Sequence, residues 1–143
     1  MLRSKYFTMY EMTYSDTAYK LKLDNTPDEE SEQNLIQLME VLDDIREKWG
    51  GPIRVTSGFR APQVNAAVGG SKTSAHLRGF AADLRPYNNK FKDFQTFIKN
   101  WAKTGDYDQI LLERNSQGME WVHIGLFNSK NQQRHQVKNL EVK

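Results

Sequence analysis

Three histidines and the absence of cysteine limit the metal chemistry that this 143-residue chain could carry out. Without thiolates, a metal ion would have to take its ligands from histidine, aspartate and glutamate side chains. The histidines are His76, His123 and His135, and none belongs to an H-E-x-x-H helix motif. A catalytic zinc site needs about three protein ligands and one open position for water. Two histidines and one carboxylate remain as the candidate ligand set, and His135 lies in a polar stretch typical of a surface.

His76 and Asp83 lie in a segment that could bring two ligands to one point. It reads S-A-H-L-R-G-F-A-A-D over residues 74–83, and its small residues let backbone approach closely. His123 lies in an apolar run, where a histidine needs a metal or a hydrogen-bonding partner. Each residue also has an ordinary explanation. His123 could be a hydrogen-bonded core histidine, Asp83 half of an ion pair, and Arg60 a surface charge in a turn.

Two amphipathic helices must help to position these residues. Apolar residues at three- and four-residue spacing run from Leu35 to Trp49, after a cap and acidic first turn at 25–30. The double glycine that follows Trp49 stops this helix. A second helix is predicted over Phe91 to Trp101. Shorter helices are predicted after a Ser15-Asp16 cap and at Pro62 to Ala67.

Alternating apolar and polar residues predict four strands, at 52–57, 80–84, 109–113 and 120–126. The turn sequence N-S-Q-G between the last two predicts an antiparallel hairpin. No repeat or linker divides the chain. We therefore expect one α+β domain over residues 1–143, with helices packed on a small, mainly antiparallel sheet. The basic residues of about 128–143 are expected to form a solvated tail.

Composition narrows the classes of partner. The net charge is only +2, from 20 basic and 18 acidic residues, and there is no basic stripe of the kind that binds nucleic acid. No apolar run approaches the roughly 20 residues of a membrane span. The first eight residues contain basic side chains but no apolar stretch behind them, so the sequence as written carries no secretory signal.

The candidate residues fall in an ordered set of motifs. These are S-G-F-R at 57–60, Asn65 with V-G-G-S at 68–71, the segment 74–83, and E-W-V-H at 120–123. Together they resemble the D-alanyl-D-alanine carboxypeptidase family of zinc peptidases, peptidase family M15. That family includes zinc D-Ala-D-Ala carboxypeptidases, D-Ala-D-Ala dipeptidases and phage L-alanyl-D-glutamate endolysins. The resemblance runs from about Tyr6 to Leu126 and implies a fold like that of hedgehog domains and DD-peptidases.

The resemblance also implies roles for single residues. It implies one zinc ion with three protein ligands, His76, Asp83 and His123. Glu120 would be the general base, as a variant of the aspartate that many relatives carry at that position. Arg60 would face the substrate or the developing oxyanion. Ser74 would orient the first ligand or contact the substrate.

The spacing of Glu120 and His123 poses a geometric difficulty. Residues three apart in a regular strand face opposite sides of the sheet. Glu120 must therefore lie before the regular strand, or a bulge next to Gly118 must turn its side chain towards the metal. If Glu120 is not the base, Glu113 on the preceding strand is the next candidate.

The resemblance implies a zinc-dependent metallopeptidase that hydrolyses peptide bonds of bacterial peptidoglycan stem peptides. It would act as a D-Ala-D-Ala carboxypeptidase or as an endolysin-type endopeptidase, and the sequence does not select the bond. The alternative is a catalytically silent, zinc-containing module that binds the cell wall or a protein. We expect a monomer, made in the cytoplasm and released to the wall in the manner of phage lysins, or exported if a signal has been removed.

Overall fold

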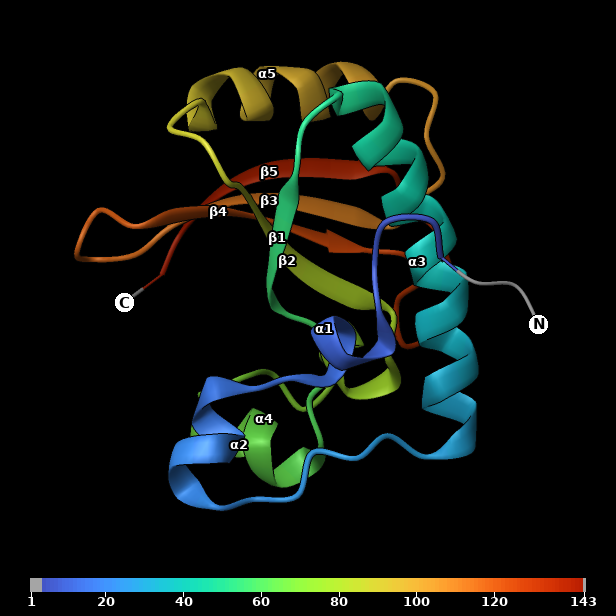
Figure 1. The fold of residues 1–143 in the computed structure, drawn as a ribbon, viewed down its shortest axis with the longest axis vertical. Helices are drawn as coiled ribbons and strands as arrows, with labels where there is room; N and C mark the ends of the chain where they lie inside the picture. The colour runs from blue at the N-terminus through green and yellow to red at the C-terminus, as the bar shows by residue number, and fades with distance from the viewer. Residues whose placement is uncertain (1–3, 143) are drawn as a thin grey trace.

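The computed structural model describes residues 4–142, in which helices surround a single sheet (Figure 1). Residues 1–3 and 143, which belong to the basic start and the basic tail of the sequence, lie outside the described residues. The elements in chain order are α1 (Met9–Thr13), α2 (Asp16–Leu21), α3 (Glu29–Trp49), β1 (Ile53–Ser57), α4 (Pro62–Ala67), the 3-10 helix η1 (Ala75–Arg78), β2 (Ala81–Pro86), α5 (Phe91–Trp101), β3 (Gln109–Arg114), β4 (Glu120–Gly125) and β5 (Gln136–Glu141).

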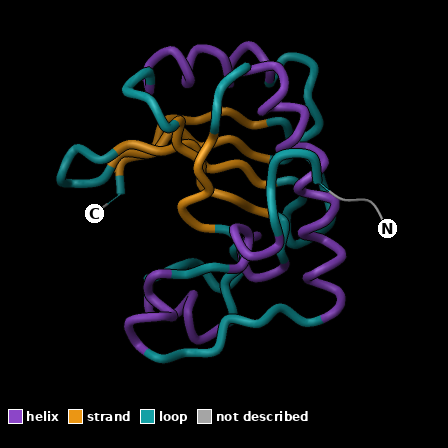
Figure 2. The backbone as a smooth tube through the Cα atoms, viewed as in Figure 1, coloured by secondary structure: helices purple, strands orange, loops and turns teal. Residues whose placement is uncertain are grey.

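The sheet contains five strands in the order β1-β2-β4-β3-β5. The pairs β1–β2, β2–β4 and β4–β3 are antiparallel, whereas β5 pairs with β3 in parallel. The strands lie side by side with helices around them (Figure 2). This confirms the predicted α+β class with a mainly antiparallel sheet. The sheet is nevertheless mixed, because β5 forms from residues that we assigned to a solvated tail.

Helix α3 forms where its apolar stripe predicted it. Its N-cap is Asp28, whose carboxylate accepts a hydrogen bond of 2.8 Å from the backbone N–H of Ser31. It ends at Gly50, which adopts a left-handed φ of 80°. The cap is Asp28 and not Asn25, so the helix starts a few residues later than expected. The side chain of Asn25 instead binds the backbone of Phe59 and Ala61. No helix of the described residues is both long and apolar enough to cross a membrane.

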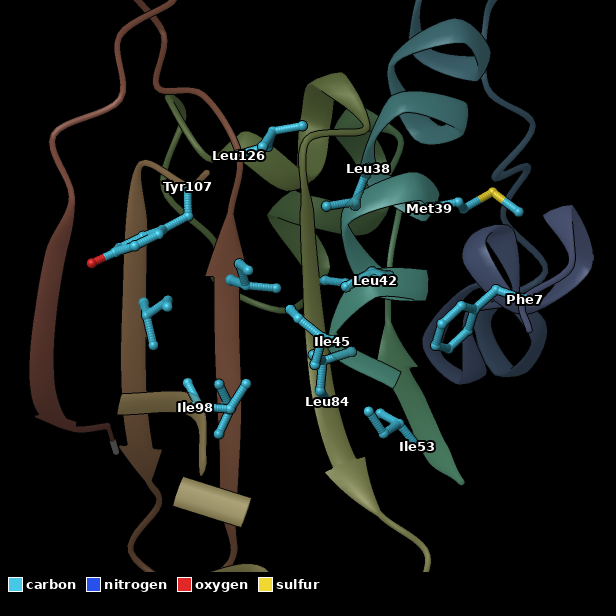
Figure 3. Packing of buried hydrophobic residues seen from close by; sticks show 14 of the residues in the cluster. Phe7, Leu38, Met39, Leu42, Ile45, Ile53, Leu84, Ile98, Tyr107 and Leu126 are labelled. Atoms are coloured by element: carbon cyan, nitrogen blue, oxygen red, sulfur yellow. The ribbon is translucent and has the colours of Figure 1, made fainter. Parts of the chain in front are cut away.

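The hydrophobic core lies between one face of the sheet and the helices α3 and α5. Leu42 and Ile45 of α3, Leu84 of β2 and Ile98 of α5 are fully buried and belong to one cluster (Figure 3). The central strands add further buried apolar residues to this face, among them Ile110, Leu112, Val122 and Ile124. Because side chains alternate along a strand, the residues between these positions point to the other face of the sheet. That second face carries the candidate site.

Candidate metal centre

Strand pairing brings Asp83 and His123 together. Asp83 of β2 lies directly opposite His123 of β4, so both side chains project from the same face of the sheet. The Nδ1 atom of His123 lies 3.0 Å from Oδ1 of Asp83. His76 approaches from η1, just before β2, and its Nε2 atom lies 3.4 Å from the same oxygen. The possible ligand atoms of the three residues all lie within 4.8 Å of one another.

This arrangement fits a divalent metal ion. Ligands at about 2.0–2.1 Å from a tetrahedral zinc ion are about 3.4 Å from each other, close to the separations seen here. The His76 side chain is only 2% exposed, whereas those of Asp83 and His123 are 16% and 14% exposed. The site is therefore closed behind His76 and open on its other side. His135 is exposed and does not belong to this group.

The environment of His76 prepares its ring for metal binding. Its Nδ1 atom lies 2.7 Å from the carbonyl oxygen of Gly58. A carbonyl can only accept, so Nδ1 carries the proton and the Nε2 lone pair faces Asp83. Burial also lowers the pKa of His76, which keeps the imidazole neutral. A neutral ring with a fixed tautomer is the form that binds a metal.

The Gly58 carbonyl is held in place because α1 packs directly against Gly58. A Cβ atom at position 58 would lie 2.2 Å from the carbonyl oxygen of Met12. That oxygen accepts a hydrogen bond of 2.8 Å from the backbone N–H of Phe59. The Asn25 side chain joins the same loop, donating to the carbonyl of Phe59 and accepting from the N–H of Ala61. The S-G-F-R motif is thus a tightly packed loop that supports the candidate ligand His76.

Replacing Gly58 with alanine should weaken metal binding without removing a ligand. The added methyl group must displace α1 or the loop, and the carbonyl that orients His76 moves with it. Loss of such an orienting partner costs roughly 10- to 100-fold in metal affinity. Competition titration with a chelating dye measures this change. Gly51→Ala is the matched control, since a Cβ there meets nothing closer than 3.5 Å; equal affinities for the two variants would contradict the role given to Gly58.

The two neighbouring imidazoles keep Asp83 ionised. Burial alone would raise the pKa of Asp83, but its interactions with His76 and His123 outweigh burial and hold the pKa below its usual range. Arg60 is also near this carboxylate. Burial lowers the pKa of the Arg60 guanidinium, while the charges of Asp83 and Glu113 raise it. Within the described residues its Nε atom is buried and has no hydrogen-bond partner.

A cavity of about 1060 Å³ opens over the three candidate ligands. Arg60, Ser74, Glu113 and Trp121 also line it. Ser74 caps η1, accepting a hydrogen bond of 3.2 Å at its hydroxyl from the backbone N–H of His76. Arg60 and Ser74, to which the resemblance gave roles, thus line the same cavity as the His/Asp/His group.

Glu120 lies elsewhere, contrary to the expected bulge or late strand start. The β3–β4 register is regular from Gln109 to Arg114, with Glu120 opposite Arg114. Its side chain therefore projects from the face opposite to that of His123. There it accepts a hydrogen bond of 3.3 Å from Gln95 of α5 and lies 3.5 Å from the Arg114 guanidinium. Glu120 does not line the cavity.

Glu113, and not Glu120, is the glutamate that lines the cavity together with the His/Asp/His group. It lies opposite Trp121, two residues from His123, and so shares the face of the metal ligands. The indole N–H of Trp121 donates a hydrogen bond of 2.7 Å to the Glu113 carboxylate. Burial raises the pKa of Glu113, and the charge of Asp83 raises it further. The sequence contains one clue to this position of Glu113. The hairpin predicted across the 115–118 turn pairs the strand of Glu113 with the strand that carries the E-W-V-H motif.

Comparison with known proteins agrees with this geometry. The model of the family described as Peptidase M15 matches residues 5–125, which include His76, Asp83 and His123. A search of curated proteins found no match.

Proposed function

Because the chain belongs to the peptidase M15 family, we propose that it is a zinc metallopeptidase that hydrolyses bacterial peptidoglycan stem peptides. The observation that carries the proposal is the convergence of a group that could hold a metal, a half-buried carboxylate and a half-buried arginine in one cavity. Each of these is a component of metal-assisted hydrolysis. Zinc is the preferred ion because a set of two histidines and one carboxylate matches its catalytic sites.

His76, Asp83 and His123 would hold the ion and leave a position open on the cavity side. Bound there, zinc supplies Lewis-acid polarisation of the scissile carbonyl and of the attacking water. The protein keeps two of its ligands in the required state. The Gly58 carbonyl fixes the tautomer of His76, and the two imidazoles keep Asp83 ionised.

We propose Glu113 as the general base, in place of Glu120. Its carboxylate takes the proton of the attacking water and later delivers it to the leaving amine. The Trp121 indole fixes one carboxylate oxygen, which leaves the other free to accept that proton. Its raised pKa suits a group that must both accept and release a proton near neutral pH.

Arg60 would stabilise the negative charge that develops on the carbonyl oxygen. Its guanidinium is held in the cavity, close enough to Asp83 and Glu113 for their charges to raise its pKa. A fixed donor in a partly desolvated site stabilises an oxyanion more than water does. Hydrolysis would then proceed without a covalent intermediate on the enzyme.

A silent binding module of the same fold remains the second candidate function. Such a module needs neither a general base nor an oxyanion donor. Here Glu113 and Arg60 line the same cavity as the metal ligands, which favours the enzyme. All these residues come from one chain, so we propose that the protein acts as a monomer. We propose that it acts at the cell wall, where its substrate is found.

Mass spectrometry of digested peptidoglycan tests the proposal directly. Zinc-loaded protein is incubated with purified stem peptides and cross-linked fragments, and a chelated sample serves as control. Release of a single D-alanine identifies a carboxypeptidase, whereas separation of L-Ala from D-Glu identifies an endolysin-type endopeptidase. Intact peptides after incubation with zinc-loaded protein that still binds them would support the silent module instead.

A further inference from the structure

Residues 128–142, which we name the C-terminal wall, lie beyond the family-matched region 5–125 yet line the same cavity as the metal centre. The wall consists of a turn followed by β5. Seven of its residues line the cavity, namely Asn128, Ser129, Lys130, Gln132, Arg134, Leu140 and Val142. On β5, Leu140 lies opposite Glu113, which places it on the face of the sheet that carries the site. The C-terminal wall therefore borders the space that a substrate would occupy.

The C-terminal wall is firmly attached at several points. Arg78 of η1 donates hydrogen bonds to the Asn128 carbonyl at 2.7 Å and to the Asn131 side chain at 2.6 Å. Arg134 binds Asp108 through two hydrogen bonds of 2.8 and 2.7 Å, and β5 pairs with β3 along its whole length. Arg78 lies two residues from His76, so the first attachment links the wall to the metal loop. A wall held in this way is preorganised to bind a ligand.

The charges of the cavity single out Lys130. Among the residues that the structure describes, three arginine and lysine residues line it: Arg60, Lys130 and Arg134. Arg134 is paired with Asp108, which is 3% exposed, whereas Arg60 is half-buried and close enough to Asp83 and Glu113 for their charges to act on its guanidinium. Lys130 has no acidic partner within 4.0 Å among residues 4–142. Arg60 is assigned above to the developing oxyanion, whereas Lys130 is exposed and, among the cavity cations at positions 4–142, is available to bind another group of the ligand.

The turn that carries Lys130 has a defined shape. The Asn128 carboxamide oxygen accepts hydrogen bonds from the backbone N–H groups of Lys130 and Gln132, at 2.9 and 2.8 Å. The Asn131 N–H donates to the Asn128 carbonyl at 2.9 Å, and Asn131 adopts a left-handed φ of 58°. These bonds fix the backbone at Lys130, whose exposed side chain lines the cavity.

We propose that Lys130 binds the free C-terminal carboxylate of the peptide substrate and so makes the chain select substrates with an unblocked C-terminus. This inference rests on the proposed peptidase function, and it assigns the substrate-selecting residue to a segment outside the family match. A lysine ammonium is a point charge that forms charge-assisted hydrogen bonds to carboxylates. An amidated C-terminus has no charge and loses that interaction.

Two peptides that differ only at the C-terminus test this. One ends in D-Ala-D-Ala as the free acid and the other in the corresponding amide. Their dissociation constants are measured by calorimetry with the zinc-loaded Glu113→Gln variant, which should bind the peptides without cleaving them. The values of kcat and KM are measured with protein that retains Glu113. Lys130→Gln should weaken binding of the free acid by on the order of 10-fold, the scale of a hydrogen bond to a charged group, and leave amide binding unchanged.

Lys130→Arg should retain the preference for the free acid because it retains the positive charge. Lys92→Gln removes an exposed lysine of α5 that does not line the cavity, and it should change neither constant. An equal effect of Lys130→Gln on both peptides, or no effect on either, would overturn the inference. Wild-type protein that binds the free acid through Lys130 but cleaves neither peptide would contradict only the proposed function. Failure to bind either peptide would contradict both.

Discussion

Glu113→Gln should lower the turnover of stem peptides by roughly two to four orders of magnitude, the scale of general acid–base catalysis. Glutamine keeps the size of the side chain and can still accept the hydrogen bond of 2.7 Å from Trp121, but it cannot take a proton from water. Glu113 does not belong to the group that could hold the metal, so the metal content should stay at one ion per chain. Steady-state hydrolysis and metal analysis on the same preparation measure both quantities.

Glu120→Gln is the matched control. It makes the same chemical change to a residue on the neighbouring strand whose side chain projects from the other face of the sheet. Its contacts are with Gln95 and Arg114, so activity should stay within a few-fold of wild type. The opposite result, with turnover lost in Glu120→Gln and kept in Glu113→Gln, would show that Glu120 is the base and that the proposed mechanism is wrong.

His123→Ala should abolish both metal binding and hydrolysis. Weakening an orienting partner of a ligand costs roughly 10- to 100-fold in metal affinity, and removing the ligand itself should cost more. The structure offers no other histidine to replace it, since His135 lies outside the ligand group. His135→Ala is therefore the matched control and should keep its metal. Full zinc occupancy in His123→Ala would contradict the ligand assignment.

Chelation of the wild-type protein should abolish activity but leave the protein folded. The apolar core between α3, α5 and the sheet contains none of the three candidate ligands. A chain of this length can bury enough surface to fold without a structural metal. The circular-dichroism spectrum should therefore survive chelation, and added zinc should restore hydrolysis. Loss of the folded spectrum would show that the metal is structural.

Strong local patterns allowed most of the fold to be predicted from the sequence. The stripe from Leu35 to Trp49 identified α3, and the alternation of Ile53 to Ser57 identified β1. The strand β5 could not be found in this way. Its residues, Q-V-K-N-L-E, are mostly polar and partly or fully exposed, so they show little of the pattern of a half-buried strand. Pairing with β3 and the attachment of Arg134 to Asp108 determine its position instead.

For the site, too, the residues within local motifs could be predicted from the sequence, whereas those that depend on strand pairing could not. Motif order was enough to select His76, Asp83 and His123, which the structure places together. Motif spacing suggested Glu120, although the two-residue period of a strand argued against it. The choice of Glu113 depends on the register between β3 and β4, and sequence patterns give no direct measure of register.

The pairing of Asp83 with His123 has a consequence for the study of folding kinetics. The two residues are 40 positions apart in the chain, and a slip of one residue between β2 and β4 would turn one of them to the other face. Non-local strand pairings of this kind form slowly, because the chain must close a long loop first. Capture of zinc during refolding therefore reports the moment at which β2 and β4 reach their native alignment. A metal-sensitive dye in a stopped-flow experiment would time that event separately from helix formation.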